Sequence, residues 1–165
     1  MKELYAEASV KKGQTLKDLF LKSALIGIAV LSLLLTAVSQ VLIIITTVVI
    51  MVVVYIFPRL NIQYEYIFCD GQFDFDKLMG NSKRKTVMVI DMEYIDIIAP
   101  TGSHELDQFN NKNPKVKNFS SLKQDAKTYV IMGHYKNELV KIIFEPNEKM
   151  LECIKLKAPR KLVKY

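Results

Sequence analysis

The acidic residues Asp70, Asp74 and Asp76 lie close together in the sequence and offer the carboxylate oxygens that hard divalent cations prefer. Their spacing differs from that of an EF-hand loop. Asp74 and Asp76 also alternate with Phe73 and Phe75, the pattern of a strand with one apolar and one polar face. We therefore expect these aspartates to face solvent from a strand, and the sequence predicts no metal site.

Residues typical of covalent or acid–base catalysis are present, but they stand in no recognised catalytic motif. His104 and His134 are far apart, and Ser120-Ser121 lies outside the G-x-S-x-G sequence of a nucleophile elbow. The six glycines are scattered and form no phosphate-binding loop. The sequence therefore predicts no catalytic residues, no cofactor and a protein that is not an enzyme.

Two clusters of basic residues are the best candidates for a binding surface. The first contains Lys83, Arg84 and Lys85, and the second contains Lys155, Lys157, Arg160, Lys161 and Lys164. The cytoplasmic leaflet of a membrane is negatively charged, and each nearby cation adds about 1 kcal/mol of attraction. We expect these residues to contact anionic lipid, and simple solubilisation of exposed faces is the alternative. No nucleic-acid-binding motif accompanies the charge, so we expect no DNA or RNA partner.

An uncharged apolar run, Ser23–Phe57, dominates the N-terminal part of a chain whose net charge is +6. A single helix over this run would be about 52 Å long at a rise of 1.5 Å per residue, whereas the hydrocarbon core of a bilayer is about 30 Å thick. A hairpin with arms near Leu19–Ala37 and Val41–Phe57, turning at Ser39-Gln40, buries both arms in lipid. One long tilted helix and a buried helix of a soluble protein are the alternatives.

The residues that flank the run favour the hairpin. Phe20 lies at the start of the first arm, while Tyr55 and Phe57 end the second, so in a hairpin all three aromatic rings share one membrane interface. Basic residues flank the same ends, namely Lys11, Lys12, Lys17 and Lys22 before the first arm and Arg59 after the second. By the positive-inside rule we expect a two-span protein of the cell membrane with both termini in the cytoplasm.

After Pro58 the hydrophobic pattern changes from helical to alternating. Asp70-Gly71, a dipeptide preferred in two-residue type I′ hairpin turns, separates a strand over Ile62–Phe68 from a return strand through Phe73 and Phe75. Further strands are expected at Thr86–Met92, Glu93–Ala99, Lys127–Tyr135 and Glu138–Phe144, with a long and partly mobile loop over residues 101–126. A final helix is expected to present Met150, Leu151, Ile154 and Ala158 on one face.

These elements predict an α+β fold. An N-terminal transmembrane helical hairpin is followed by a small antiparallel β-sheet, or a partly open barrel, that a C-terminal helix caps. Thr15 and Asp18 have the spacing of a capping box, which predicts a helix start at the membrane surface. We divide the chain into a cytoplasmic tail over residues 1–14, a membrane anchor over residues 15–58 and a cytoplasmic domain over residues 59–165.

Three stretches of the C-terminal half carry a resemblance to a known family. They are Lys83–Pro100, Asn118–Leu122 and Ile142–Lys161, which read KRKTVMVIDMEYIDIIAP, NFSSL and IIFEPNEKMLECIKLKAPRK. These stretches resemble domain-of-unknown-function family 6106, a family of uncharacterised membrane proteins of Gram-positive bacteria. The strand order is similar to that of bacterial pleckstrin-homology-like (PH-like) domains that follow paired membrane helices. The resemblance implies a PH-like fold and brings no catalytic signature.

Taken together, these features predict a membrane-anchored interaction module. Its PH-like domain would bind a protein or peptide near the bilayer, through a sheet edge or a groove between sheet and helix. The expected partners are the lipid bilayer and a protein, and a homo-oligomer is a further possibility. Sensing of anionic lipid by the basic clusters is the alternative function, and an enzyme acting on a membrane substrate is the third.

Overall fold

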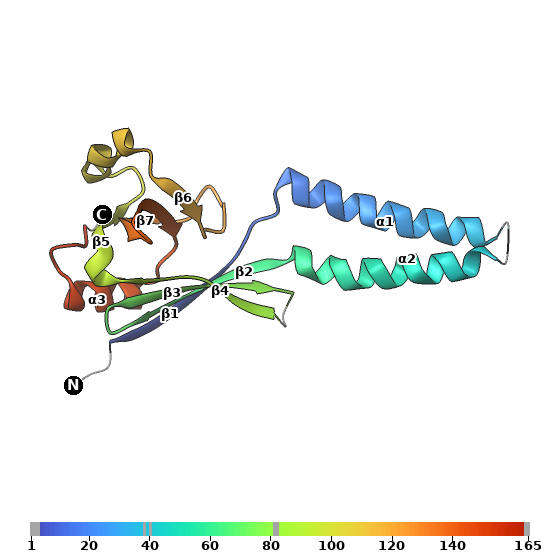
Figure 1. The fold of residues 1–165 in the computed structure, drawn as a ribbon, viewed down its shortest axis with the longest axis horizontal. Coiled ribbons are helices and arrows are strands. Elements are labelled where there is room, and N and C mark those ends of the chain that lie inside the picture. Colours follow the sequence, from blue (N-terminus) through green and yellow to red (C-terminus); the bar gives the residue numbers. More distant parts are fainter. Residues whose placement is uncertain (1–3, 38, 40, 81–82, 164–165) are drawn as a thin grey trace. The chain divides into compact units, whose positions relative to one another are not determined.

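The computed structural model describes residues 4–37, 39, 41–80 and 83–163. The chain forms two compact units (Figure 1). The helical unit contains Gly13–Ile62 and Met79–Lys83, and the strand unit contains Met1–Lys12, Gln63–Leu78 and Arg84–Tyr165. The helices are inserted between the first two strands of one sheet. One short segment leads from the first strand into the helices, and a second leads from the helices into the second strand.

Two helices make up most of the helical unit, which confirms the hairpin over a single long helix. They are α1 (Leu16–Thr36) and α2 (Leu42–Ile56), and a 3₁₀ helix, η1 (Phe57–Leu60), continues α2. The helical segments Leu16–Thr36 and Leu42–Leu60 are long and apolar enough to cross a membrane. Thr15 caps α1 in a capping box with Asp18, as the spacing predicts. Of the predicted turn, Ser39 lies between the helices, and Gln40 lies outside the described residues.

Polar groups join the two helices at two levels. Thr46 is buried, and its hydroxyl donates to the carbonyl oxygen of Ser32 at 2.9 Å, a contact that satisfies a polar side chain on an apolar helix. Near the open end, the ammonium of Lys22 donates to Oδ1 of Asn61 at 2.9 Å and lies 6.0 Å from the ring centre of Phe57. These contacts hold the two arms together at both levels.

The strand unit begins with a strand that the sequence did not predict. The first sheet has the order β1-β2-β3-β4, from β1 (Tyr5–Lys11), β2 (Ile62–Cys69), β3 (Gln72–Met79) and β4 (Lys83–Asp91). The sequence predicts a cytoplasmic tail over residues 1–14, yet Tyr5–Lys11 pairs antiparallel with β2. Ala6 fills a fully buried inward position, and alanine is a weak β-former, so the alternation of β1 carries little hydrophobic signal.

The predicted hairpin between β2 and β3 is confirmed. Asp70 (φ 45°) and Gly71 (φ 103°) both have positive φ, as a type I′ turn requires. The strands predicted over Thr86–Met92 and Glu93–Ala99 correspond to β4 and β5 (Ile95–Pro100), and a 3₁₀ turn at Met92–Tyr94 separates them by a bend. This bend carries the chain from the first sheet into the second.

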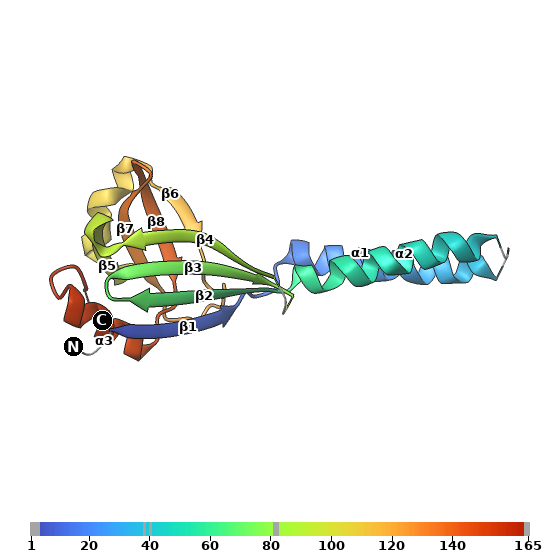
Figure 2. The same cartoon turned by 60° about the horizontal axis from the view of Figure 1, so that its bottom comes forward.

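The second sheet has the order β5-β7-β8-β6 and packs behind the first (Figure 2). The predicted hairpin is present as β7 (Tyr129–Tyr135) and β8 (Glu138–Phe144), joined by Lys136 and Asn137, both with positive φ. The segment predicted as one long loop contains a 3₁₀ helix (His104–Lys112) and β6 (Lys115–Asn118). Because β6 pairs parallel with β8, its strand conformation depends on a distant partner rather than on its own sequence.

The core lies between the two sheets and is closed by α3 (Glu148–Lys157), which packs against β1. Met150 and Ile154 are fully buried on one face of α3, as predicted. Aromatic rings fill the centre, and Phe68 and Phe73 lie 4.8 Å apart between ring centres. The predicted α+β fold with an apolar hairpin, sheets that are antiparallel except at β6, and a C-terminal helix is thus confirmed, and the sheets of the described chain do not close into a barrel.

One buried polar group ties β2 to the segment after β6. Tyr66 is fully buried, and its hydroxyl donates to the carbonyl oxygen of Phe119. Burial is the main cause that raises the pKa of this phenol well above its usual range, and the nearby charge of Glu145 acts in the same direction. Tyr64 lies two residues earlier, is only partly buried and packs edge-on against Phe119.

We expect Tyr66→Phe to lower the free energy of unfolding by about 1–2 kcal/mol, because the Phe119 carbonyl loses its buried donor. Tyr64→Phe is the matched control and should change stability by less than about 0.5 kcal/mol. Stability should also fall as pH rises above about 10, since the unfolded phenol deprotonates there while the folded one stays neutral. Denaturant unfolding followed by near-ultraviolet circular dichroism measures both effects, and equal losses in the two variants would contradict this role.

Candidate functional site

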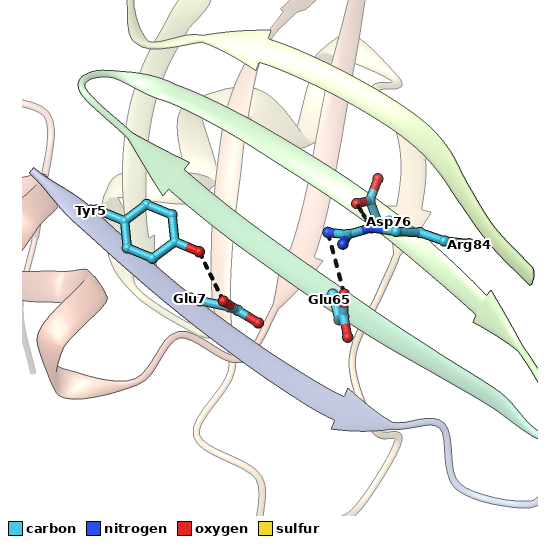
Figure 3. Close-up of polar contacts among 5 residues, drawn as sticks. All are labelled: Tyr5, Glu7, Glu65, Asp76 and Arg84. Atoms are coloured by element: carbon cyan, nitrogen blue, oxygen red, sulfur yellow. Dashed lines mark hydrogen bonds and ion pairs between the residues drawn. The ribbon is translucent and has the colours of Figure 1, made fainter. Parts of the chain in front are cut away.

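The first basic cluster lies at the start of β4, and its middle residue is engaged in ion pairs. Nε of Arg84 lies 2.6 Å from Oδ2 of Asp76, and a terminal guanidinium nitrogen lies 3.3 Å from Oε2 of Glu65 (Figure 3). The hydrogen bond to Asp76 is the main cause that raises the pKa of Arg84. Lys83 and Lys85 on either side are exposed. The charge of Arg84 is therefore neutralised by two carboxylates. Among the described residues of this cluster, only Lys83 and Lys85 have charges that are available to a ligand.

Asp76 is buried, contrary to the prediction of a solvent-facing strand. Its residue is 4% exposed, and Oδ1 has no hydrogen-bond partner among the described residues. Arg84 reaches across from the neighbouring strand and covers it, which alternation along β3 alone does not reveal. Asp74 stays partly exposed, and Gln72 donates to it at 2.8 Å.

The same sheet face carries a second polar pair on β1. The hydroxyl of Tyr5 donates to Oε2 of Glu7 at 2.8 Å, and this bond is the main cause that raises the pKa of Tyr5 (Figure 3). Within the described residues, no group of three or more His, Cys, Asp or Glu side chains is arranged to hold a metal ion. The face is therefore a polar surface held by internal pairs.

The residues considered for catalysis are dispersed in the structure. His104 lies 3.4 Å from Asp107, and His134 lies 3.6 Å from Asp96 on the second sheet. Ser120 is buried and donates to Oδ1 of Asn118 at 2.7 Å. Each of these contacts joins only two residues, and among the described residues none of them brings His104, His134 and Ser120 together.

The second basic cluster is also partly engaged. Lys157 forms an ion pair with Asp70 at 2.7 Å, and Lys161 donates to the carbonyl oxygen of Met92 at 2.8 Å. Lys155 and Arg160 are exposed and make no hydrogen bond or ion pair with the described part of the chain. Lys164 lies outside the described residues. Two cations of this cluster thus hold the end of α3 to the β2–β3 turn and to the bend after β4.

The two basic clusters do not form one patch. Lys157 contacts the turn that precedes β3, whereas Lys85 lies just after the turn that follows β3. An eight-residue strand separates these turns, and it is roughly 25 Å long at 3.3 Å per residue. One lipid surface or ligand cannot use both clusters as a single compact site.

A different surface, which the sequence analysis did not identify, lies along β4. Lys85, Val87 and Val89 occupy alternate positions and are all exposed, whereas Met88, between the two valines, and Ile90, after them, belong to the core. The end of β4 borders a groove of about 300 Å³. Its walls come from the end of β4, the bend at Tyr94, and the β7–β8 turn from His134 to Asn137. The alternating lysine and valines were visible in the sequence, but the sequence does not show that β4 is the edge strand, which leaves its outer backbone groups without a neighbouring strand in the described chain.

Comparison with known families agrees with this architecture of two sheets and a C-terminal helix. The family model described as Bacterial PH-like domain (DUF6106) matches residues 2–164. The chain belongs to this family. No curated protein and no solved structure gives a significant match. The match begins before β1 and extends beyond α3, so this bacterial PH-like family includes the apolar helices within the span that defines it.

We expect Arg84→Met to lower the free energy of unfolding by about 1–2 kcal/mol, because Asp76 stays buried and loses its charged partner, and the exposure of Arg84 limits the effect. The matched control is Lys85→Met, which removes an exposed cation from the adjacent position and should cost less than about 0.5 kcal/mol. Denaturant unfolding of the two variants measures the difference. Equal stability of the two variants would show that the Arg84 pairs contribute nothing beyond surface charge.

Proposed function

We propose that this bacterial PH-like protein is a membrane-anchored interaction module. In this proposal α1 and α2 insert into the bilayer as a hairpin, and the PH-like domain binds a protein or peptide close to the membrane surface. The two apolar helices, the exposed edge of β4 and the dispersed arrangement of the catalytic residue types support a binding role over an enzymatic one. A cell-membrane location is part of the proposal.

The observation that carries the proposal is the insertion of the helices between β1 and β2. These strands pair antiparallel, and Lys11 at the end of β1 faces Gln63 at the start of β2. The chain therefore leaves and re-enters the sheet at one end. A hairpin of two spans returns the chain to the side from which it started, whereas a single span would separate the paired strands by a bilayer. For helices placed in a membrane, the pairing of β1 with β2 is therefore compatible with a two-span hairpin and incompatible with a single span.

Charge supports an orientation with the domain in the cytoplasm. The basic residues near the open end of the hairpin are Lys11, Lys12, Lys17, Lys22 and Arg59. The guanidinium of Arg59 lies 3.7 Å from the ring centre of Tyr55, an arrangement that suits an aromatic and basic belt at the membrane interface. Under the positive-inside rule, this end and both termini face the cytoplasm.

Cysteine labelling tests this topology. In a variant with Cys69 and Cys153 replaced, single cysteines at Ser9, Ser39 and Ser103 are treated with an impermeant thiol reagent in intact cells. We expect labelling at position 39 and protection at positions 9 and 103, because the turn faces outward while the domain is inside. Lysed cells provide the control for reactivity at each site. Labelling at only one of positions 9 and 103 would place them on opposite sides of the membrane and overturn the two-span anchor. Labelling at both positions would overturn the cytoplasmic location.

Sensing of anionic lipid is a second candidate, and one observation favours it. β4 begins at the end of the first sheet where β1 ends and β2 begins, so Lys83 and Lys85 lie at the end to which the helices connect. Both are exposed, and neither makes a hydrogen bond or ion pair with the described residues. Lys155 and Arg160 lie toward the opposite end of the sheet. Only the first pair would then contact headgroups.

The lipid candidate predicts different effects for two matched charge removals. Replacing Lys83 and Lys85 by Gln should reduce the selectivity of the full chain for anionic over zwitterionic lipid, because about 1 kcal/mol of attraction is lost per cation near the surface. The control replaces Lys155 and Arg160 by Gln and should leave the selectivity unchanged. Electron paramagnetic resonance of spin-labelled lipids in reconstituted membranes measures it, at low and high salt. Equal selectivity in both variants would rule out a lipid role for Lys83 and Lys85.

A further inference from the structure

The edges of the two sheets differ in how far they are already occupied. A free edge presents unpaired backbone N–H and C=O groups to which another strand can add. β5 is covered by the C-terminal segment, since the amide of Ile98 donates to Lys161 at 2.7 Å and its carbonyl accepts from Val163 at 2.8 Å. β6 spans only Lys115–Asn118, and Lys115 pairs with Glu138 at 3.0 Å.

The edge at β1 is also held by other parts of the domain. The side chain of Asn147 donates from Nδ2 to the carbonyl oxygen of Glu7 at 2.8 Å, and α3 packs against β1. The remaining edge is β4, which has nine residues and pairs with β3 on one side only within the described chain. β4 therefore offers the longest row of backbone groups for an added strand.

We propose that the free edge of β4 docks an extended segment of a partner protein, with an acidic residue opposite Lys85 and apolar residues opposite Val87 and Val89. This inference rests on the proposed interaction function and names the site and the chemistry of its partner. Addition of a strand would supply backbone hydrogen bonds, and the exposed side chains of β4 would select the sequence. The partner segment then reads acidic-x-apolar-x-apolar in one chain direction or the other.

The side chains of β4 define this partner chemistry. Lys85, Val87 and Val89 share one face of the strand because they lie two residues apart. Val87 is 38% exposed and Val89 40% exposed, so part of each β-branched side chain can pack against a residue on an added strand. Lys85 is exposed and has no ion-pair or hydrogen-bond partner in the described chain. Arg84 is neutralised by Asp76 and Glu65, so Lys85 is the free cation nearest to the two valines, and Lys83 lies two residues further from them on the same face.

The groove at the end of β4 provides space for the same segment. Residues 89–91 line one side of it consecutively, so it runs beside the strand edge rather than over one face. Tyr94, which is 58% exposed, and Tyr135 contribute to the other walls. The ammonium of Lys136 lies 5.4 Å from the ring centre of Tyr135. An apolar side chain of the partner can pack on these rings, and Lys136 adds a second positive charge near the docked segment.

Peptide binding to the full-length protein tests the proposal. The protein is reconstituted in zwitterionic nanodiscs, and the probe is a short fluorescein-labelled peptide whose core reads Glu-Thr-Val-Thr-Val, with a matched peptide in which Lys replaces Glu. We expect saturable anisotropy changes with the acidic peptide and about tenfold weaker binding of the basic one. Hydrogen–deuterium exchange should slow in β4 when the acidic peptide is bound, because its edge amides gain partners.

Substitutions on the two exposed edges localise the binding. Lys85→Glu should weaken binding of the acidic peptide about tenfold and favour the basic peptide. Replacing Val87 and Val89 by Thr should weaken both, because Thr keeps the shape and removes the apolar contact. The controls on β6 are Lys117→Glu and Val116→Thr, which make the same types of substitution on the edge of the other sheet and should leave affinity unchanged.

Several outcomes would overturn the assignment to β4. These are the absence of saturable binding, equal binding of both peptides, and loss of binding in the β6 variants rather than in those of β4. A change in the chain's own oligomeric state without a change in peptide affinity would assign the edge to a second copy of the chain instead. Binding that depends on β6 would overturn the assignment to β4 and remain consistent with the proposed interaction module. The membrane anchor is tested separately by the cysteine labelling, which uses no peptide.

Discussion

The antiparallel pairing of β1 with β2 is the constraint on which the rest of the structure depends. The strands are neighbours in space, from Tyr5 opposite Cys69 to Lys11 opposite Gln63, yet both helices separate them in the sequence. Closing such a long loop costs conformational entropy, which the paired backbone and the burial of Ala6 must offset. Two antiparallel helices reduce that cost because they bring their own ends together. The packed hairpin and the sheet therefore stabilise each other.

Much of the fold could be predicted because its signals are local. The uncharged run predicts two apolar helices, Thr15 and Asp18 predict a helix start, and Asp70-Gly71 predicts a hairpin turn. Each of these structures depends on a continuous segment of sequence, and each is confirmed. β1 and β6 escaped prediction because their strand conformation depends on partners far away in the sequence. In β1 the small side chain of Ala6 weakens the apolar signal, and in β6 two lysines hide it.

The candidate sites were harder to predict than the fold because the availability of a charged side chain to a ligand depends on which residues lie beside it in the folded chain. Arg84 belonged to an apparent basic cluster, yet its guanidinium joins Asp76 and Glu65 from two other strands. Lys157 likewise neutralises Asp70 at the far end of the sheet. A cluster of basic residues in the sequence therefore does not show which of its charges are already paired with carboxylates in the fold. The exposed side of β4 became a candidate only when the sheet order made it an edge.

The insertion of the hairpin also affects how the domain would respond to cleavage. A domain that hangs from one terminal linker is released when a protease cuts that linker. Here, two covalent connections leave the first sheet, one after Lys11 and one before Gln63. A cut in the first connection leaves the domain attached through β2, and a cut in the second leaves it held through β1 and its hydrogen bonds. Shedding from a membrane would require two cuts, or one cut followed by unfolding of the sheet.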